Sequence, residues 1–149
     1  MSKPTKPSGN RQLKTRVKTA KKRTVSSARW LSRQLNDPYV HQAKRDGYRS
    51  RAAYKLLELD EKFHFLKAGK TVLDLGAAPG GWTQVAIAAV KSSKQHPLVV
   101  GIDLLPMDPL PGATLMQLDF MADEAPQILR EHLPNGADIV LSDMAPNTI

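Results

Sequence analysis

The chain has 149 residues, no cysteine and a formal net charge of +8. This length accommodates one domain of ordinary size, and the lack of cysteine excludes disulfides and thiolate metal sites. No apolar run approaches the roughly 18 residues of a membrane span, and we expect no secretory signal, because the first residues lack an apolar segment. We therefore expect a protein of a reducing compartment, the cytoplasm, that has no membrane partner.

The charge is unevenly distributed along the chain. Residues 1–36 contain eleven Lys and Arg and no acidic residue, whereas the remainder contains eleven basic against fourteen acidic residues. Residues 1–25 combine high charge with few apolar side chains, which predicts a basic arm that is disordered when free. Such an arm also fits an organelle transit peptide and thus a mitochondrial location. Its excess of Lys over Arg, with Pro4, Pro7 and Gly9, favours an RNA-binding arm before a single domain over residues 26–149.

Two helices are expected next in the chain. The first begins at Ser26 or Ser27 and ends at the Asn-Asp-Pro sequence of residues 36–38. The second covers residues 51–63 and is capped by Ser50. Its apolar residues recur with helical spacing and form one stripe, made of Ala52, Leu56, Leu59 and Phe63.

Lys55 lies at the flank of that stripe, about 70° from its centre by the helical period. At this position a side chain borders a packed core and can still reach a cleft. Without further context, its alternative role is that of an ordinary solvated helix lysine.

From Lys70 onward, short aliphatic runs alternate with helical segments. The runs are rich in β-branched residues and cover residues 71–75, 98–102, 114–118 and 138–142. Helices are expected over residues 82–91 and 123–133, the second imperfect because of Pro126. This alternation predicts right-handed βαβ units and an α/β fold with a mostly parallel sheet.

A glycine-rich turn, Gly76-Ala-Ala-Pro-Gly80-Gly81, follows the first predicted strand. Its spacing differs from the dinucleotide fingerprint, and Trp82 stands where a phosphate-binding loop requires lysine. Gly76 permits a tight exit from the strand, and Gly80 and Gly81 are expected to let a ligand approach the backbone. Free N–H groups at the start of the next helix attract a phosphate or a carboxylate.

Acidic residues stand at all four predicted strands. Asp74 lies within the first, and Asp103, Asp119 and Asp143 follow the other three. Ligands of open parallel sheets bind at the carboxyl ends of the strands, where so many carboxylates disfavour a polyphosphate. S-adenosylmethionine, with a sulfonium, an ammonium, ribose hydroxyls and one carboxylate, fits better. Taken alone, any one of these aspartates is also a common turn former, and Trp82 is also an ordinary core residue.

These motifs together resemble the FtsJ-type ribosomal RNA ribose 2′-O-methyltransferases, and the bacterial large-subunit enzymes among them in particular. The resemblance begins at about Ser27 and is strongest at residues 49–59, 74–82, 103–109, 118–120 and 142–147. It implies a Rossmann-like methyltransferase fold of seven strands, of which about three would lie beyond Ile149. It also implies a monomer that methylates a ribose, expected on a uridine, in large-subunit ribosomal RNA, free or within the ribosomal subunit.

The resemblance assigns roles to individual residues. Gly80 and Trp82 would line the methionine and ribose side of S-adenosylmethionine. Asp103 would accept hydrogen bonds from the ribose hydroxyls, and Asp119 would face the adenine amino group. Asp143 would lie close to the methyl donor.

The resemblance also implies a catalytic Lys-Asp-Lys-Glu set, of which Lys55 and Asp143 match the first two members. The principal lysine and the glutamate are expected beyond Ile149. We therefore expect this chain to be a fragment or a truncated product that is poorly active by itself. No metal is required, and the four histidines show no convincing ligand spacing.

A second basic cluster precedes Lys55, and we expect it to bind RNA phosphates. It consists of Lys44, Arg45, Arg49 and Arg51. The alternative for this cluster is a solvated surface. For the whole chain, two other functions remain open, a non-catalytic RNA-binding module and a nicotinamide-dependent oxidoreductase, the latter disfavoured by the glycine spacing.

Overall fold

The computed structural model describes residues 37–143, and the chain divides into two units between Asp46 and Gly47. The described part of the first unit is a helix, α2 (Pro38–Asp46). Asp37 caps it, because its carboxylate accepts a hydrogen bond from the Tyr39 N–H at 2.8 Å, and Pro38 occupies the favoured first helical position. The sequence interpretation used Asn-Asp-Pro only as a stop signal and missed this helix. The predicted basic arm and the helix expected before residue 36 lie outside the described residues.

The described part of the second unit, residues 47–143, contains a four-stranded sheet and three helices. The strands are β1 (Val72–Leu75), β2 (Val99–Asp103), β3 (Ala113–Gln117) and β4 (Ile139–Ser142). The helices are α3 (Ala52–Phe63), α4 (Gly81–Val90) and α5 (Ala125–His132). All strand pairs are parallel, in the order β3-β2-β1-β4. The predicted α/β fold with a parallel sheet is confirmed, and each predicted strand agrees with an observed one to within a residue at either end.

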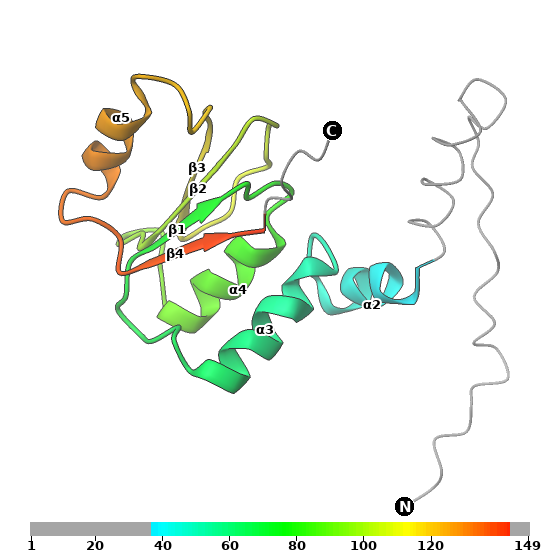
Figure 1. Cartoon of the computed structure of the whole chain (residues 1–149). Helices are drawn as coiled ribbons and strands as arrows, with labels where there is room; N and C mark the ends of the chain where they lie inside the picture. Colours follow the sequence, from blue (N-terminus) through cyan, green and yellow to red (C-terminus); the bar gives the residue numbers. More distant parts are fainter. Residues whose placement is uncertain (1–36, 144–149) are drawn as a thin grey trace, which may run out of the picture. The chain divides into compact units, whose positions relative to one another are not determined.

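Helices cover both faces of the sheet, with α3 and α4 on one face and α5 on the other (Figure 1). Alternate strand residues supply the two cores, as a pleated strand requires. Val72 and Val99 pack with α3 and α4, whereas Leu73 and Val100 pack on the side of α5. No helix within residues 37–143 is both long and apolar enough to cross a membrane.

Three details of the helices differ from the prediction. Arg51 is the N-cap of α3 and no side chain caps the helix, so the predicted cap by Ser50 is wrong. Phe63 was expected in the apolar stripe but is 62% exposed, because α3 buries only Ala53 and Leu56, in its first half. Pro126 falls in the first turn of α5, where its missing N–H breaks no helical bond.

The amino-terminal ends of β1 and β4 are joined by a group of hydrogen bonds. The Asp138 carboxylate accepts from the Thr71 N–H at 2.9 Å and from the Thr71 hydroxyl at 3.1 Å. These bonds, the backbone one first, hold the pKa of Asp138 below its usual value. The N–H groups of Asp138 and Ile139 both donate to the Thr71 carbonyl at 3.0 Å. The starting point of β4 beside β1 is therefore fixed.

Gly101 in β2 provides a test of this packing. A Cβ atom there would lie 2.7 Å from Cδ2 of Leu115 and 3.1 Å from Cβ of Ala77, so Gly101→Ala overpacks the sheet below the glycine turn. We expect a loss of about 1–3 kcal/mol in the free energy of unfolding, measured by urea denaturation. Leu115→Ala removes the side chain that the new Cβ would meet. The double variant should therefore lose less stability than the two single variants lose in sum. A Gly101→Ala variant as stable as the wild type would contradict this packing.

Candidate functional site

The strand order indicates a candidate ligand site at the carboxyl ends of β1 and β4. The chain passes from β1 through β2 to β3 on one side and then returns to the other side of β1 as β4. The strand order therefore reverses between β1 and β4, and such a reversal is the usual position of a ligand crevice in open parallel sheets. The glycine turn follows β1, and Asp143 directly follows β4.

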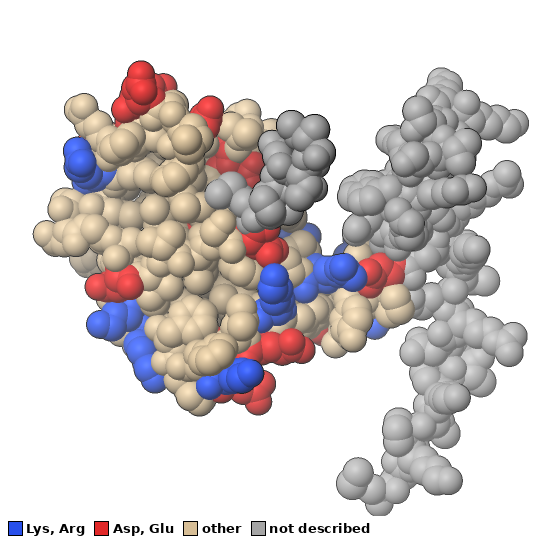
Figure 2. Space-filling view, viewed as in Figure 1, with Lys and Arg blue, Asp and Glu red and all other residues tan. Residues whose placement is uncertain are grey.

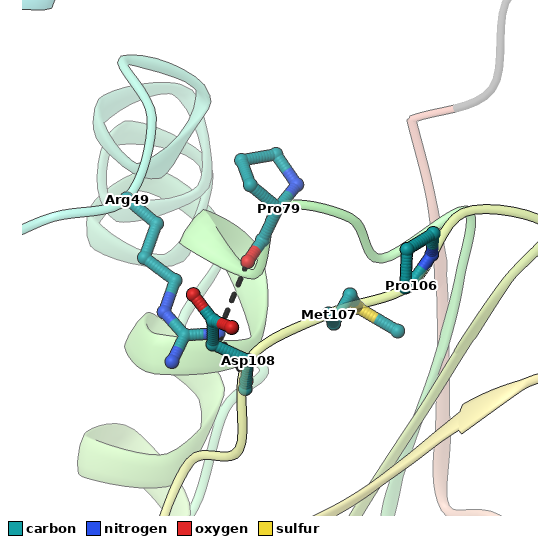
Figure 3. Close-up of a pocket in the computed structure, with 5 residues that line it drawn as sticks. All are labelled: Arg49, Pro79, Pro106, Met107 and Asp108. Carbon is teal, nitrogen blue, oxygen red and sulfur yellow. Dashed lines mark hydrogen bonds between the residues drawn. The ribbon is translucent and has the colours of Figure 1, made fainter.

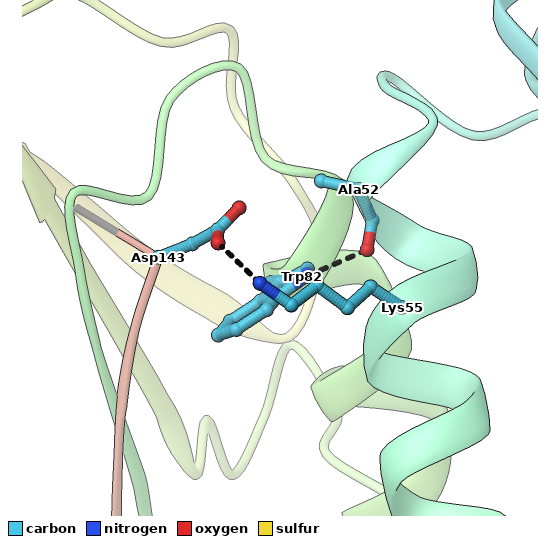
Figure 4. A network of polar contacts seen from close by, with 4 residues as sticks. All are labelled: Ala52, Lys55, Trp82 and Asp143. Carbon is cyan, nitrogen blue, oxygen red and sulfur yellow. Dashed lines mark hydrogen bonds and ion pairs between the residues drawn. The ribbon is translucent and has the colours of Figure 1, made fainter. Parts of the chain in front are cut away.

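Lys55 and Asp143 meet at this edge (Figure 4). The Lys55 Nζ lies 3.2 Å from Oδ1 of Asp143, although the two residues are 88 positions apart. Both side chains remain accessible, at 63% and 39% exposure. An ion pair this exposed contributes little to stability, so a substrate can take over either partner at small cost.

Trp82 lies beneath this ion pair. The Lys55 ammonium is 5.8 Å from the centroid of the indole ring, within the range of a cation–π contact. The indole N–H donates to the carbonyl of Ala52 at 2.6 Å (Figure 4), which fixes the ring between α3 and α4. Trp82 is only 7% exposed and belongs to the core, and its predicted contact with a cofactor stays a prediction.

Asp74 is the one buried carboxyl among the described residues, at 1% exposure. Its Oδ2 accepts a hydrogen bond from the Thr83 hydroxyl at 2.8 Å. Burial raises the pKa of Asp74 to about 6, against the lowering effect of the Thr83 bond, and the negative charges of Asp143 and Asp103 raise it further. The sequence analysis counted Asp74 among the acidic residues that favour a cationic ligand but assigned it no individual role. The signal was an acidic residue inside an otherwise apolar strand.

Asp103 joins the glycine turn to the loop after β2. Its Oδ2 accepts from the Ala78 N–H and its Oδ1 from the Leu105 N–H, each at 2.9 Å. Each carboxylate oxygen has a second lone pair, so the group can still accept hydrogen bonds from ligand hydroxyls. Its predicted role at the ribose is compatible with this arrangement and stays a prediction.

Asp119 follows β3 and accepts a hydrogen bond from the Met121 N–H at 2.9 Å. This is the turn-forming arrangement that any aspartate after a strand can adopt. The predicted contact of Asp119 with adenine therefore stays a prediction. Within residues 37–143 no group of three or more His, Cys, Asp or Glu side chains is placed to hold a metal ion.

Side chains of the protein pack against two glycines of the glycine turn. Gly80 has φ 118°, and a Cβ there would lie 3.2 Å from Cδ of Arg49 and 3.3 Å from Cδ1 of Leu110. A Cβ on Gly81 would overlap the hydroxyl of Ser50. The space left by both missing side chains thus accommodates Arg49, Leu110 and Ser50. The approach of a ligand to the backbone at Gly80 and Gly81, and the predicted contact of Gly80 with the cofactor, stay predictions.

The four predicted RNA-binding residues have different surroundings. Lys44 and Arg45 are exposed in the last turn of α2, where basic side chains also stabilise the helix dipole. Arg51 is exposed, whereas Arg49 is half-buried. In Figure 2, basic and acidic residues are interspersed over the visible face, without one basic patch. An RNA-binding role for these four residues stays a prediction.

The guanidinium of Arg49 borders a hollow of about 410 Å³ (Figure 3). Pro79 of the glycine turn lines one side, and Pro106, Met107 and Asp108 of the loop after β2 line the other. The hollow thus lies between the same two loops that Asp103 joins.

Comparison with known proteins identifies the family of this chain. Residues 48–149 match the model of the FtsJ-like methyltransferases. The chain belongs to this family. The match begins just after the division between the two units and covers the whole of the sheet described above.

Two bacterial members illustrate the similarity, and both are named ribosomal RNA large subunit methyltransferase E. The chain is 59% identical to the one from Parvibaculum lavamentivorans over 147 residues and 61% identical to the one from Paramagnetospirillum magneticum over 142 residues. Each alignment covers 94% of this chain but 58% of the relative. The chain thus spans little more than half the length of these relatives.

A solved structure of a ribosomal RNA methyltransferase from Plasmodium falciparum has the same fold. It aligns with a TM-score of 0.59 at 41% identity and covers 68% of this chain and 59% of the other. This structure supports the Rossmann-like architecture of the parallel sheet.

The buried carboxyl of Asp74 predicts a pH dependence of stability. The pKa of Asp74 is 3.8 in the unfolded chain and about 6 in the folded chain. At a pH between these two values, the unfolded chain has released the Asp74 proton while the folded chain keeps it. Rising pH therefore favours unfolding across this window. Relative to Asp74→Asn, the wild type should lose up to about 3 kcal/mol between pH 4 and pH 7, measured by urea denaturation.

Asp123→Asn, which removes an exposed carboxyl, is the control and should follow the wild-type profile. Parallel profiles for the wild type and Asp74→Asn would show that the Asp74 carboxyl is ionised as easily in the folded as in the unfolded chain.

Proposed function

We propose that the protein to which this chain belongs transfers a methyl group from S-adenosylmethionine to a ribose 2′-hydroxyl of large-subunit ribosomal RNA. The observation that carries the proposal is the meeting of Lys55 and Asp143 at the β1–β4 edge of an FtsJ-like chain. The names of the bacterial relatives support ribosomal RNA as substrate and the cytoplasm as location. A uridine target and a monomeric state rest on the sequence resemblance alone.

The acidic side chains at this edge fit a cationic cofactor. The charges of Asp143 and Asp103 both act on the buried Asp74 and raise its pKa, so a positively charged ligand among the three would be stabilised. Asp103 retains lone pairs for ribose hydroxyls beyond its two backbone bonds. When bound, S-adenosylmethionine supplies an electrophilic methyl group attached to a positively charged sulfur.

Lys55 and Asp143 would then hold the 2′-hydroxyl. The ammonium of Lys55 has hydrogen-bond donors and no lone pair, so it orients the attacking oxygen by donating to it. Asp143 would accept from the hydroxyl and could hold its proton as the O–C bond forms and the methyl–sulfur bond breaks, which leaves a neutral thioether. The packing of Trp82 beneath Lys55 limits the positions of the ammonium, which favours one alignment of the nucleophile.

The first test is a calorimetric titration of S-adenosylmethionine into the 149-residue chain, with circular dichroism of the same samples. We expect saturable binding at one site and at least tenfold weaker binding to Asp103→Ala, because that variant loses a ribose acceptor and a loop cross-link. Glu131→Ala, an exposed acid on α5, is the control. A folded chain that ignores the cofactor would favour the RNA-binding module, and binding of NADH instead would favour the oxidoreductase.

The second test concerns catalysis in the complete protein. Lys55→Ala should lower the single-turnover rate of methyl transfer to large-subunit RNA by about a hundredfold or more, with cofactor affinity unchanged. Lys62→Ala, later on the same helix, is the matched control. Label from a radioactive methyl group should appear in alkali-resistant dinucleotides, since only a 2′-O-methyl group protects the adjoining phosphodiester. An unchanged rate in Lys55→Ala removes this lysine from the mechanism, and alkali-labile label removes the ribose as acceptor.

A further inference from the structure

Arg49 connects two loops that are distant in the sequence. Its Nη1 donates to the carbonyls of Pro79, at 3.2 Å, and Asp108, at 2.5 Å. Its Nη2 donates to the carbonyl of Pro109 at 2.8 Å. Pro79 belongs to the glycine turn after β1, and the other two residues belong to the loop after β2. One planar guanidinium therefore holds both loops (Figure 3).

The backbone of Arg49 is itself fixed by α4. The Arg49 N–H donates to Oε1 of Gln84 at 2.7 Å, and Nε2 of Gln84 donates to the carbonyl of Gly47 at 3.0 Å. Gln84 thus pairs with the main chain on both sides of Tyr48. The guanidinium is directed at the loops from a segment that cannot easily shift.

Asp103 joins the same two loops through their N–H groups, at Ala78 and Leu105. The two loops therefore have two cross-links of opposite chemistry, a carboxylate that accepts from amides and a guanidinium that donates to carbonyls. Gly80 fits between them, since its missing side chain gives room to the Arg49 stem. The orientation of the Asp103 carboxylate depends on loops that Arg49 holds in place.

We propose that Arg49 is a positioning residue for the cofactor, which holds the glycine turn and the loop after β2 in the geometry that binds S-adenosylmethionine. This inference rests on the proposed function. The main role of Arg49 is then this cross-link rather than a phosphate contact, because three of its five N–H donors already donate to main-chain carbonyls. The positive charge serves to strengthen the bonds to these carbonyls.

Arg49→Lys separates the two roles, because lysine keeps the charge and cannot bridge three carbonyls as a planar fork. Hydrogen exchange without ligand should become about tenfold faster or more in residues 76–81 and 104–112. The Kd for S-adenosylmethionine should rise about tenfold, while RNA affinity at fixed salt stays within twofold. Arg130→Lys, an exposed arginine on α5, should change none of these.

In the complete protein, Arg49→Lys should raise the KM for the cofactor with kcat at saturation unchanged, whereas a general loss of folded protein would lower kcat instead. Unchanged exchange and cofactor Kd would overturn the proposal, as would loss of RNA affinity with cofactor affinity retained. If Arg49→Lys does not fold, Gln84→Ala decides, since it should accelerate exchange in the same two segments. If the two loops exchange more slowly in the wild type than in Arg49→Lys but the wild type binds no S-adenosylmethionine, the loop cross-link stands and the proposed function is overturned.

Discussion

β1 pairs in parallel with β2 on one side and β4 on the other, and this register determines where the site residues emerge. Leu75 lies opposite Ile102 of β2 and Ser142 of β4. The glycine turn, Asp103 and Asp143 therefore begin at nearly the same level along the sheet. The bonds between Thr71 and Asp138 fix the opposite end of the β1–β4 pair. A slip of β4 by one residue would turn its side chains to the other face and separate Asp143 from Lys55.

The same register concentrates negative charge at one edge. Burial of the Asp74 carboxyl is unfavourable, and the charges of Asp143 and Asp103 make it more so. The Thr83 hydroxyl offsets only part of this effect. Titratable groups with strongly shifted pKa values are common at functional sites. In the proposed function, a cationic ligand relieves the repulsion that the fold itself creates, so cofactor binding and fold stability are coupled through Asp74.

Local sequence patterns were enough to predict the strands of the sheet. Each aliphatic run and the glycine turn can be recognised from a few consecutive residues. Contacts between distant segments were beyond such patterns. From the sequence, Arg49 was interpreted as one member of a basic cluster. Nothing near it in the sequence indicates its hydrogen bonds to the carbonyls of Pro79 and Pro109. Phe63 continued the helical stripe but extends past the part of α3 that packs on α4. The resemblance to a family, rather than periodicity, was what paired Lys55 with Asp143.

The charges that favour a cationic cofactor oppose an RNA substrate. From residue 37 onward the chain has eleven basic and fourteen acidic residues, whereas residues 1–36 have eleven basic and no acidic ones. RNA affinity therefore cannot come from the net charge of the segment from residue 37 to residue 149. Within it, Lys55 places a positive charge directly against Asp143, at the point where a ribose would have to enter. In the proposed function, residues 1–36 would attract the phosphate backbone, and the ion pair of Lys55 with Asp143 would let the ribose approach the acidic side chains.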